Sequence, residues 1–145
     1  MPSTYDVRVS CKAPQQKVFD LVADAPGWPK WAGPAVRWGG WVQEGDPAPG
    51  GVGAIRKLGS KQMGTREQIL EFDPPHYMAY TLLTPTPVRD YRAIVSIDPE
   101  GDGCRITWAA TMEGRFPGAG PAMAFLLGRF IRGTATRLAR YAETH

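Results

Sequence analysis

Three polar residues, Arg66, Tyr80 and Arg92, stand among apolar residues on segments with the alternation of β-strands. Because successive strand side chains point to opposite sides, Arg66 shares a face with Leu70, and Tyr80 shares a face with Leu82. An arginine buried in such a wall needs an anionic or hydrogen-bonding partner, since an unpaired buried charge is strongly unfavourable. A ligand carboxylate or enolate would be such a partner. The three residues are therefore weak candidates for acid–base chemistry, and no catalytic residue is assigned.

The same arginines also fit a solvent-exposed face of a sheet. Arg66 has Glu67 and Glu71 as neighbours on its own segment, where a surface ion pair contributes at most about 1 kcal/mol to stability. Each arginine is thus either a cavity group or a solvated one, and Tyr80 has the same alternatives. Both interpretations stay open for all three residues.

Other kinds of chemistry lack the residues that they require. The two histidines, His76 and His145, do not stand in a metal-binding spacing such as HExxH. The segment GGVGAIRKLG has no GK[ST] sequence, and Arg56 takes the place of the third glycine of a dinucleotide-binding motif. The chain has no asparagine and no GxSxG segment, which excludes two common nucleophilic arrangements. We therefore expect neither a metal site nor a cofactor.

The composition indicates one soluble globular domain, residues 1–145, with 43% hydrophobic and 21% charged residues. The net charge of +3 is modest and spread over both halves, which argues against nucleic-acid binding. No run of residues is apolar enough for an integral membrane segment, and the first residues lack an apolar signal region, which favours a cytoplasmic protein. Cys11 and Cys104 are far apart in the sequence, and we expect reduced, buried thiols.

The predicted order of elements is one strand, two short helices, six further strands and one long helix. The first strand places Tyr5, Val7, Val9 and Cys11 on one face. Residues 14–22 predict a short helix that Pro26 ends, and the segment 28–32 predicts a second one. Short turns separate the next strands, as in an antiparallel meander; these strands span 36–44, 52–59, 63–72, 76–84, 88–97 and 104–114.

The last part of the chain repeats apolar residues at three and four positions, which is typical of a helix. Its predicted apolar face holds Met123, Leu126, Leu127, Phe130, Ile131, Thr134, Leu138 and Tyr141. One helix, about 10 Å wide, does not fill a strongly curved sheet, so either bulky side chains plug the gap or a cavity remains. We expect Trp28 and Trp31 to close the end of the sheet that this helix leaves open.

If the apolar strand faces line a cavity, aromatic and aliphatic side chains form its walls. The expected ligand contacts are Trp28, Trp31, Gln68, Leu70, Tyr80, Leu82, Tyr91, Trp108, Met112, Met123, Leu127, Phe130 and Ile131. A solid core is the competing interpretation for the same side chains, because large apolar residues pack interiors as readily as they line pockets.

Several segments together resemble a known family. APQQKVFDLVADAPGWPKW (13–31) is similar to the entry segment of the START-like, or SRPBCC, superfamily, while EFDPPHYMAY (71–80) and GDGCRITWAATMEG (101–114) resemble its polyketide cyclase/dehydrase branch. The resemblance implies an α+β helix-grip fold: a curved seven-stranded antiparallel sheet wraps round a long C-terminal helix, with two short helices after the first strand and a hydrophobic cavity between sheet and helix. In the polyketide cyclases such arginines and tyrosines bind substrate oxygens, and Arg66, Tyr80 and Arg92 are the candidates by this resemblance.

The leading hypothesis is a carrier or sensor that binds a hydrophobic or amphipathic small molecule, such as a fatty acid, lipid or polyketide. The alternative is a polyketide cyclase/dehydrase (aromatase) that uses pocket arginines and tyrosine. A second alternative is a protein-interaction module, such as an Hsp90 activator-like protein or a toxin–antitoxin partner, which an exposed apolar patch would favour. The expected partner is a small hydrophobic ligand, and the expected state is a monomer or a homodimer. Family membership does not choose among these functions.

Overall fold

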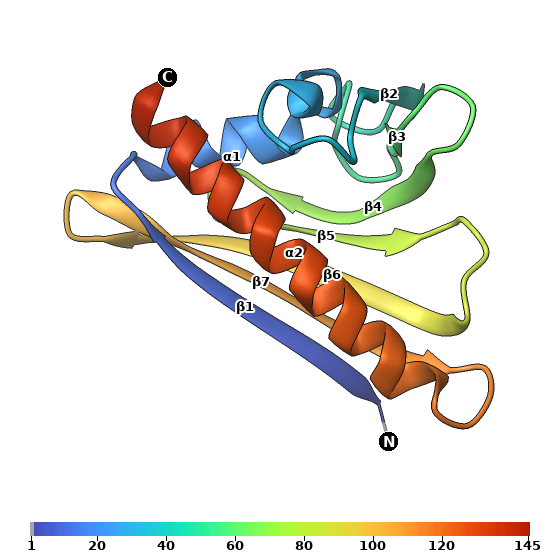
Figure 1. Cartoon of the computed structure of the whole chain (residues 1–145). Coiled ribbons are helices and arrows are strands. Elements are labelled where there is room, and N and C mark those ends of the chain that lie inside the picture. The colour runs from blue at the N-terminus through green and yellow to red at the C-terminus, as the bar shows by residue number, and fades with distance from the viewer. Residues whose placement is uncertain (1) are drawn as a thin grey trace.

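The computed structural model describes residues 2–145 and contains a curved seven-stranded antiparallel sheet crossed by one long helix (Figure 1). This is the α+β helix-grip arrangement that the sequence predicts. The strand order is β1-β7-β6-β5-β4-β3-β2, so the first strand lies beside the last and the others form a meander. The strands are β1 (Ser3–Cys11), β2 (Trp38–Gln43), β3 (Ile55–Gly59), β4 (Thr65–Asp73), β5 (Tyr77–Leu82), β6 (Val88–Glu100) and β7 (Gly103–Gly114).

Two short helices follow β1, as predicted. Pro14 immediately precedes α1 (Gln15–Ala23), where its missing N–H removes no helical hydrogen bond. A 3₁₀ helix, η1 (Ala25–Lys30), comes next and contains Pro29. The indole rings of Trp28 and Trp31 lie 4.6 Å apart between their centroids, and both side chains are buried. The short helices therefore close one end of the sheet with two tryptophans, as expected.

The long helix α2 (Ala119–Thr144) packs mainly against β1 and β7. Its buried side is rich in alanine, so its backbone lies close to the sheet. A Cβ atom added to Gly128 would lie 3.2 Å from the Cβ of Tyr5. Part of the predicted apolar face is wrong: Leu126 is 61% exposed and Phe130 is 46% exposed. The helix is turned so that small residues face β1 and β7, which pushes these two larger side chains outward.

The C-terminal end of β1 lies beside β7 and contacts the C-terminal half of α2. Cys11 of β1 pairs in register with Cys104 of β7, and both are free, buried thiols. The thiol of Cys11 donates a hydrogen bond to the carbonyl of Ala139 at 3.4 Å, and the backbone N–H of Lys12 donates to Glu143 Oε2 at 2.9 Å.

None of the helices described within residues 2–145 is long and apolar enough to cross a membrane.

Candidate functional site

A cavity of about 390 Å³ lies between the sheet and the first half of α2. Its wall is mostly apolar, with side chains from η1, β3, β4, β5, β6, β7 and α2, and the loops after η1, β3 and β5 complete it. The volume falls at the lower end of the range of small-molecule sites, roughly 300 to 1,000 Å³. The polar groups on this wall therefore determine what kind of molecule fits.

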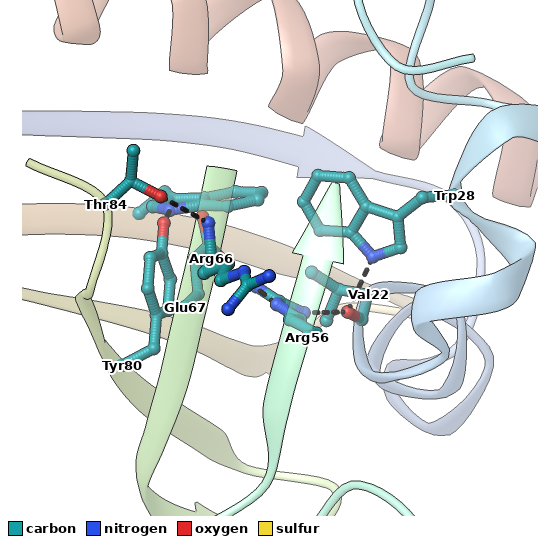
Figure 2. A network of polar contacts seen from close by, with 8 residues as sticks. Val22, Trp28, Arg56, Arg66, Glu67, Tyr80 and Thr84 are labelled. Atoms are coloured by element: carbon teal, nitrogen blue, oxygen red, sulfur yellow. Dashed lines mark hydrogen bonds and ion pairs between the residues drawn. The ribbon is translucent and has the colours of Figure 1, made fainter. Parts of the chain in front are cut away.

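A buried ion pair stands beside the cavity. Arg56 of β3 and Glu67 of β4 are paired in register, and Arg56 Nε donates to Glu67 Oε1 at 2.8 Å (Figure 2). Arg56 Nη1 donates to the carbonyl oxygen of Val22 at 2.9 Å. The Arg56 side chain is fully buried. The Glu67 side chain is 11% accessible, and Glu67 lines the cavity. The carboxylate, not the guanidinium, is thus the charged group that a ligand would meet.

Two aromatic rings hold the guanidinium of Arg56 in place. Its Cζ atom lies 4.9 Å from the Trp28 ring centroid and 5.2 Å from the Tyr80 ring centroid, both within cation–π range. Trp28 Nε1 donates to the same Val22 carbonyl at 2.9 Å, as Figure 2 also shows. Among residues 2–145, Arg56 Nη2 has no hydrogen-bond partner. Arg56 therefore depends on Glu67 for charge compensation.

Buried hydroxyl groups continue this network. Trp108 Nε1 donates to the hydroxyl oxygen of Tyr80 at 3.0 Å, and the hydroxyl groups of Tyr5 and Tyr91 share a hydrogen bond of 2.5 Å. Burial raises the pKa of Tyr80 well above its usual value, so its hydroxyl keeps its proton at neutral pH. Burial also raises the pKa of the Glu67 carboxyl, and the attraction of Arg56 opposes this shift.

Many of the sequence-predicted contact residues line this cavity. The structure brings together Trp28, Tyr80, Leu82, Tyr91, Trp108, Met123, Leu127, Phe130 and Ile131. Their role in binding stays a prediction, since no ligand accompanies them. Tyr80 is also the one catalytic candidate of the three that faces the cavity.

The predicted inward face of β4 is wrong for three residues. Arg66 and Leu70 are exposed, and Gln68 hydrogen-bonds outside the cavity, to the Gly53 carbonyl. The cause is a β-bulge between Ile69 and Glu71, because an extra residue reverses the alternation of side chains. Phe72 packs inward, with its ring centroid 5.6 Å from that of Phe19. Counting back from Phe72 by twos therefore selects the outer side of the first half of β4.

Three other predicted residues also lie away from the cavity. Arg92 pairs with Glu71 on the outer face, where both side chains are about two-fifths exposed. Trp31 packs behind Trp28, and Met112 is buried at 1% exposure but does not reach the cavity wall. Of the two interpretations left open for Arg66 and Arg92, the structure favours the solvent-exposed one.

Sequence reasoning missed the ion pair. The pattern predicts a strand over 52–59 that contains Arg56, and it offers Glu67 only as a possible surface partner for Arg66. One signal was present: Arg56 alternates with Leu58 and Ala54, which places it on an apolar strand face. No comparable signal marks Glu67, because the bulge that turns it inward has no glycine or proline to indicate it.

Comparisons with known proteins agree with this architecture. The family model described as polyketide cyclase / dehydrase and lipid transport matches residues 3–143. A search of curated proteins found no match.

Similar solved structures share the fold at low sequence identity. A START superfamily protein from Mycobacterium smegmatis is 16% identical, with a TM-score of 0.78 and 97% of each chain covered. A protein from Thermobifida fusca is 24% identical, with a TM-score of 0.75 and coverage of 98% of this chain and 97% of that one. The di-domain ARO/CYC StfQ of the steffimycin biosynthetic pathway is 12% identical, with a TM-score of 0.77; the match covers 99% of this chain and 52% of StfQ.

Proposed function

The chain belongs to the polyketide cyclase / dehydrase and lipid transport family, and from that premise we propose that it is a carrier or sensor that binds a hydrophobic or amphipathic small molecule between its sheet and α2. The observation that carries this proposal is the cavity of about 390 Å³ with its largely apolar wall. Burial of an apolar ligand there is favourable by roughly 25 cal/mol for each Å² removed from water. The polar groups at Glu67 and Tyr80 would orient the ligand.

A ligand panel tests this function. Purified protein is titrated with fatty acids, long-chain alcohols and aromatic polyketide-like compounds, and binding is read by native mass spectrometry and by tryptophan fluorescence. Trp28 and Trp108 line the cavity, so an occupant changes their emission. We expect at least one ligand with a Kd well below about 1 mM. Failure of every compound to bind below that level would contradict the proposal.

Two matched variants locate the binding. Met123→Trp places a large ring at a position that lines the cavity, and Ala122→Trp places the same ring at an exposed neighbouring position. We expect Met123→Trp to weaken binding by at least about tenfold, or about 1.4 kcal/mol. Calorimetry is the measurement here, because the added tryptophans change the fluorescence. Equal losses in both variants would place the ligand elsewhere.

A polyketide cyclase/dehydrase activity is the second candidate, and one observation favours it. Glu67 and Tyr80 supply ionisable groups on the cavity wall, and acid–base catalysis needs a group within hydrogen-bond reach of its substrate. The same panel distinguishes this function from simple binding. A polyketide-like compound that leaves the protein with the mass of one water lost would indicate dehydration, and one with the same mass but a changed chromatographic retention would indicate cyclisation alone. A compound recovered with both unchanged would indicate a carrier.

A further inference from the structure

The charges around the cavity are arranged asymmetrically. The lining residues include one ionisable acid, Glu67, and no arginine or lysine, within the chain from 2 to 145. Arg56 lies behind the wall at 0% exposure, with its guanidinium between two aromatic rings. A ligand therefore meets the acceptor of the ion pair and not its donor.

Glu67 also keeps acceptor capacity. Its Oε1 atom accepts from Arg56 Nε, and no hydrogen bond to its Oε2 atom occurs among the described residues. The Oε2 atom is not fully buried, and 11% of the Glu67 side chain is accessible. An ionised carboxylate oxygen without a partner can only accept hydrogen bonds, so it favours a ligand that carries an N–H or O–H donor, such as a hydroxyl group, over one that carries acceptors alone.

Tyr80 supplies the complementary group. Its hydroxyl oxygen accepts from Trp108 Nε1, and its side chain lines the cavity, with the hydroxyl groups of Tyr5 and Tyr91 close by. An alcohol or phenol can donate to Glu67 and accept from a tyrosine, because a hydroxyl does both. A carboxylate can only accept, and it would bring a second negative charge beside Glu67 into a site of low dielectric.

Resting on the proposed binding function, we infer that the cavity selects neutral ligands with a hydroxyl group over carboxylates, and that Glu67 is the residue that determines this choice. Protonation of Glu67 would leave the buried charge of Arg56 without compensation, because arginine stays protonated. The cation of the ion pair is buried next to the rings of Trp28 and Tyr80, and only its anion lines the cavity. A ligand that donates a hydrogen bond is therefore favoured over one that carries a negative charge.

Three ligands with the same chain test the selectivity: 1-decanol, decanoic acid and decane. Binding to the wild-type protein is measured by calorimetry at a pH of about 8, where the acid is ionised. We expect the alcohol to bind at least about tenfold more tightly than the acid. Decanoic acid binding as tightly as decanol, or decane binding as tightly as decanol, would overturn the inference while leaving the proposed function intact. Binding of none of the three would overturn the inference, and it would overturn the proposed function as well only if every compound of the wider panel also failed to bind.

Substitution of Glu67 tests which residue is responsible. Glu67→Gln keeps the shape but leaves Arg56 uncompensated, so we expect the preference for decanol to fall at least about tenfold or to reverse. Glu71→Gln, which changes a carboxylate on the outer face of the same strand, is the matched control and should keep the wild-type preference. An unchanged preference in Glu67→Gln would overturn its assigned role. Circular dichroism checks folding, and if Glu67→Gln does not fold, the wild-type comparison still decides the selectivity.

Discussion

Arg56 and Glu67 form a buried ion pair in which each residue depends on the other. The guanidinium has lost all its contact with water and has gained Glu67, the Val22 carbonyl and two aromatic rings. Desolvation of two charges is costly, and their attraction repays it only while both partners remain. The pair is therefore a poor source of net stability and a strong constraint on which substitutions the site tolerates.

Removal of one partner should be far more damaging than removal of both. We expect Glu67→Ala to lower the free energy of unfolding by about 3–5 kcal/mol, because it leaves Arg56 buried and uncompensated. The double variant Arg56→Met/Glu67→Leu should be more stable than Glu67→Ala, since it removes the buried charge altogether. Urea denaturation measures both. A double variant that is less stable than the single one would show that the pair itself holds the sheet together.

At the scale of elements, α2 contains two glycines with different surroundings. A Cβ atom at Gly133 would have nothing within 4 Å, while one at Gly128 would press on Tyr5 of β1. Gly128 thus permits the close approach of helix and sheet, and Gly133 has no packing role. The sequence pattern alone does not distinguish these two glycines.

Alanine substitutions separate the two positions. Gly133→Ala should raise the free energy of unfolding by up to about 1 kcal/mol, through the higher helix propensity of alanine. Gly128→Ala gains the same propensity but must push β1 and α2 apart, so we expect little gain or a net loss. Thermal unfolding of the two variants provides the comparison. Equal stabilisation by both would mean that the helix does not need the space at Gly128.

The elements were more predictable than the site. Alternation in β1, β6 and β7 correctly placed Tyr5, Tyr91 and Trp108 on the buried face, because these strands keep their phase over the residues concerned. In β4 the bulge after Ile69 changes the phase, and a local pattern cannot reveal that the partner strand has one residue fewer. The ion pair was missed for a related reason: a charged residue becomes a core residue only when another strand supplies its counter-charge.

At the scale of the whole molecule, several buried groups keep their protons in the folded state. Burial raises the pKa of Tyr5, Tyr80 and Tyr91, and it raises the pKa of the Cys104 thiol to about 12. The unfolded chain releases the same protons nearer to the ordinary values, about 10 for tyrosine and 8.5 for cysteine. Alkali therefore favours the unfolded state.

The pH dependence of stability follows from this difference. Stability should be unaffected by these groups below a pH of about 8.5, and it should fall as the pH rises towards 12. Each group that ionises only in the unfolded chain contributes up to about 1.4 kcal/mol per pH unit. Urea midpoints across this range measure the slope, and Tyr91→Phe should make it shallower. A midpoint that stays constant up to the highest pH would contradict the burial of these groups.

The pairing of β1 with β7 beneath α2 also governs when the protein can take shape. During synthesis, residues 3–11 leave the ribosome well before their neighbours in the sheet, residues 103–114, and before Ala139, which contacts Cys11. β1 must therefore wait, with neither edge paired and its apolar side uncovered, until β7 and α2 have been made. A nascent chain of this design is vulnerable to aggregation until β7 and α2 have left the ribosome.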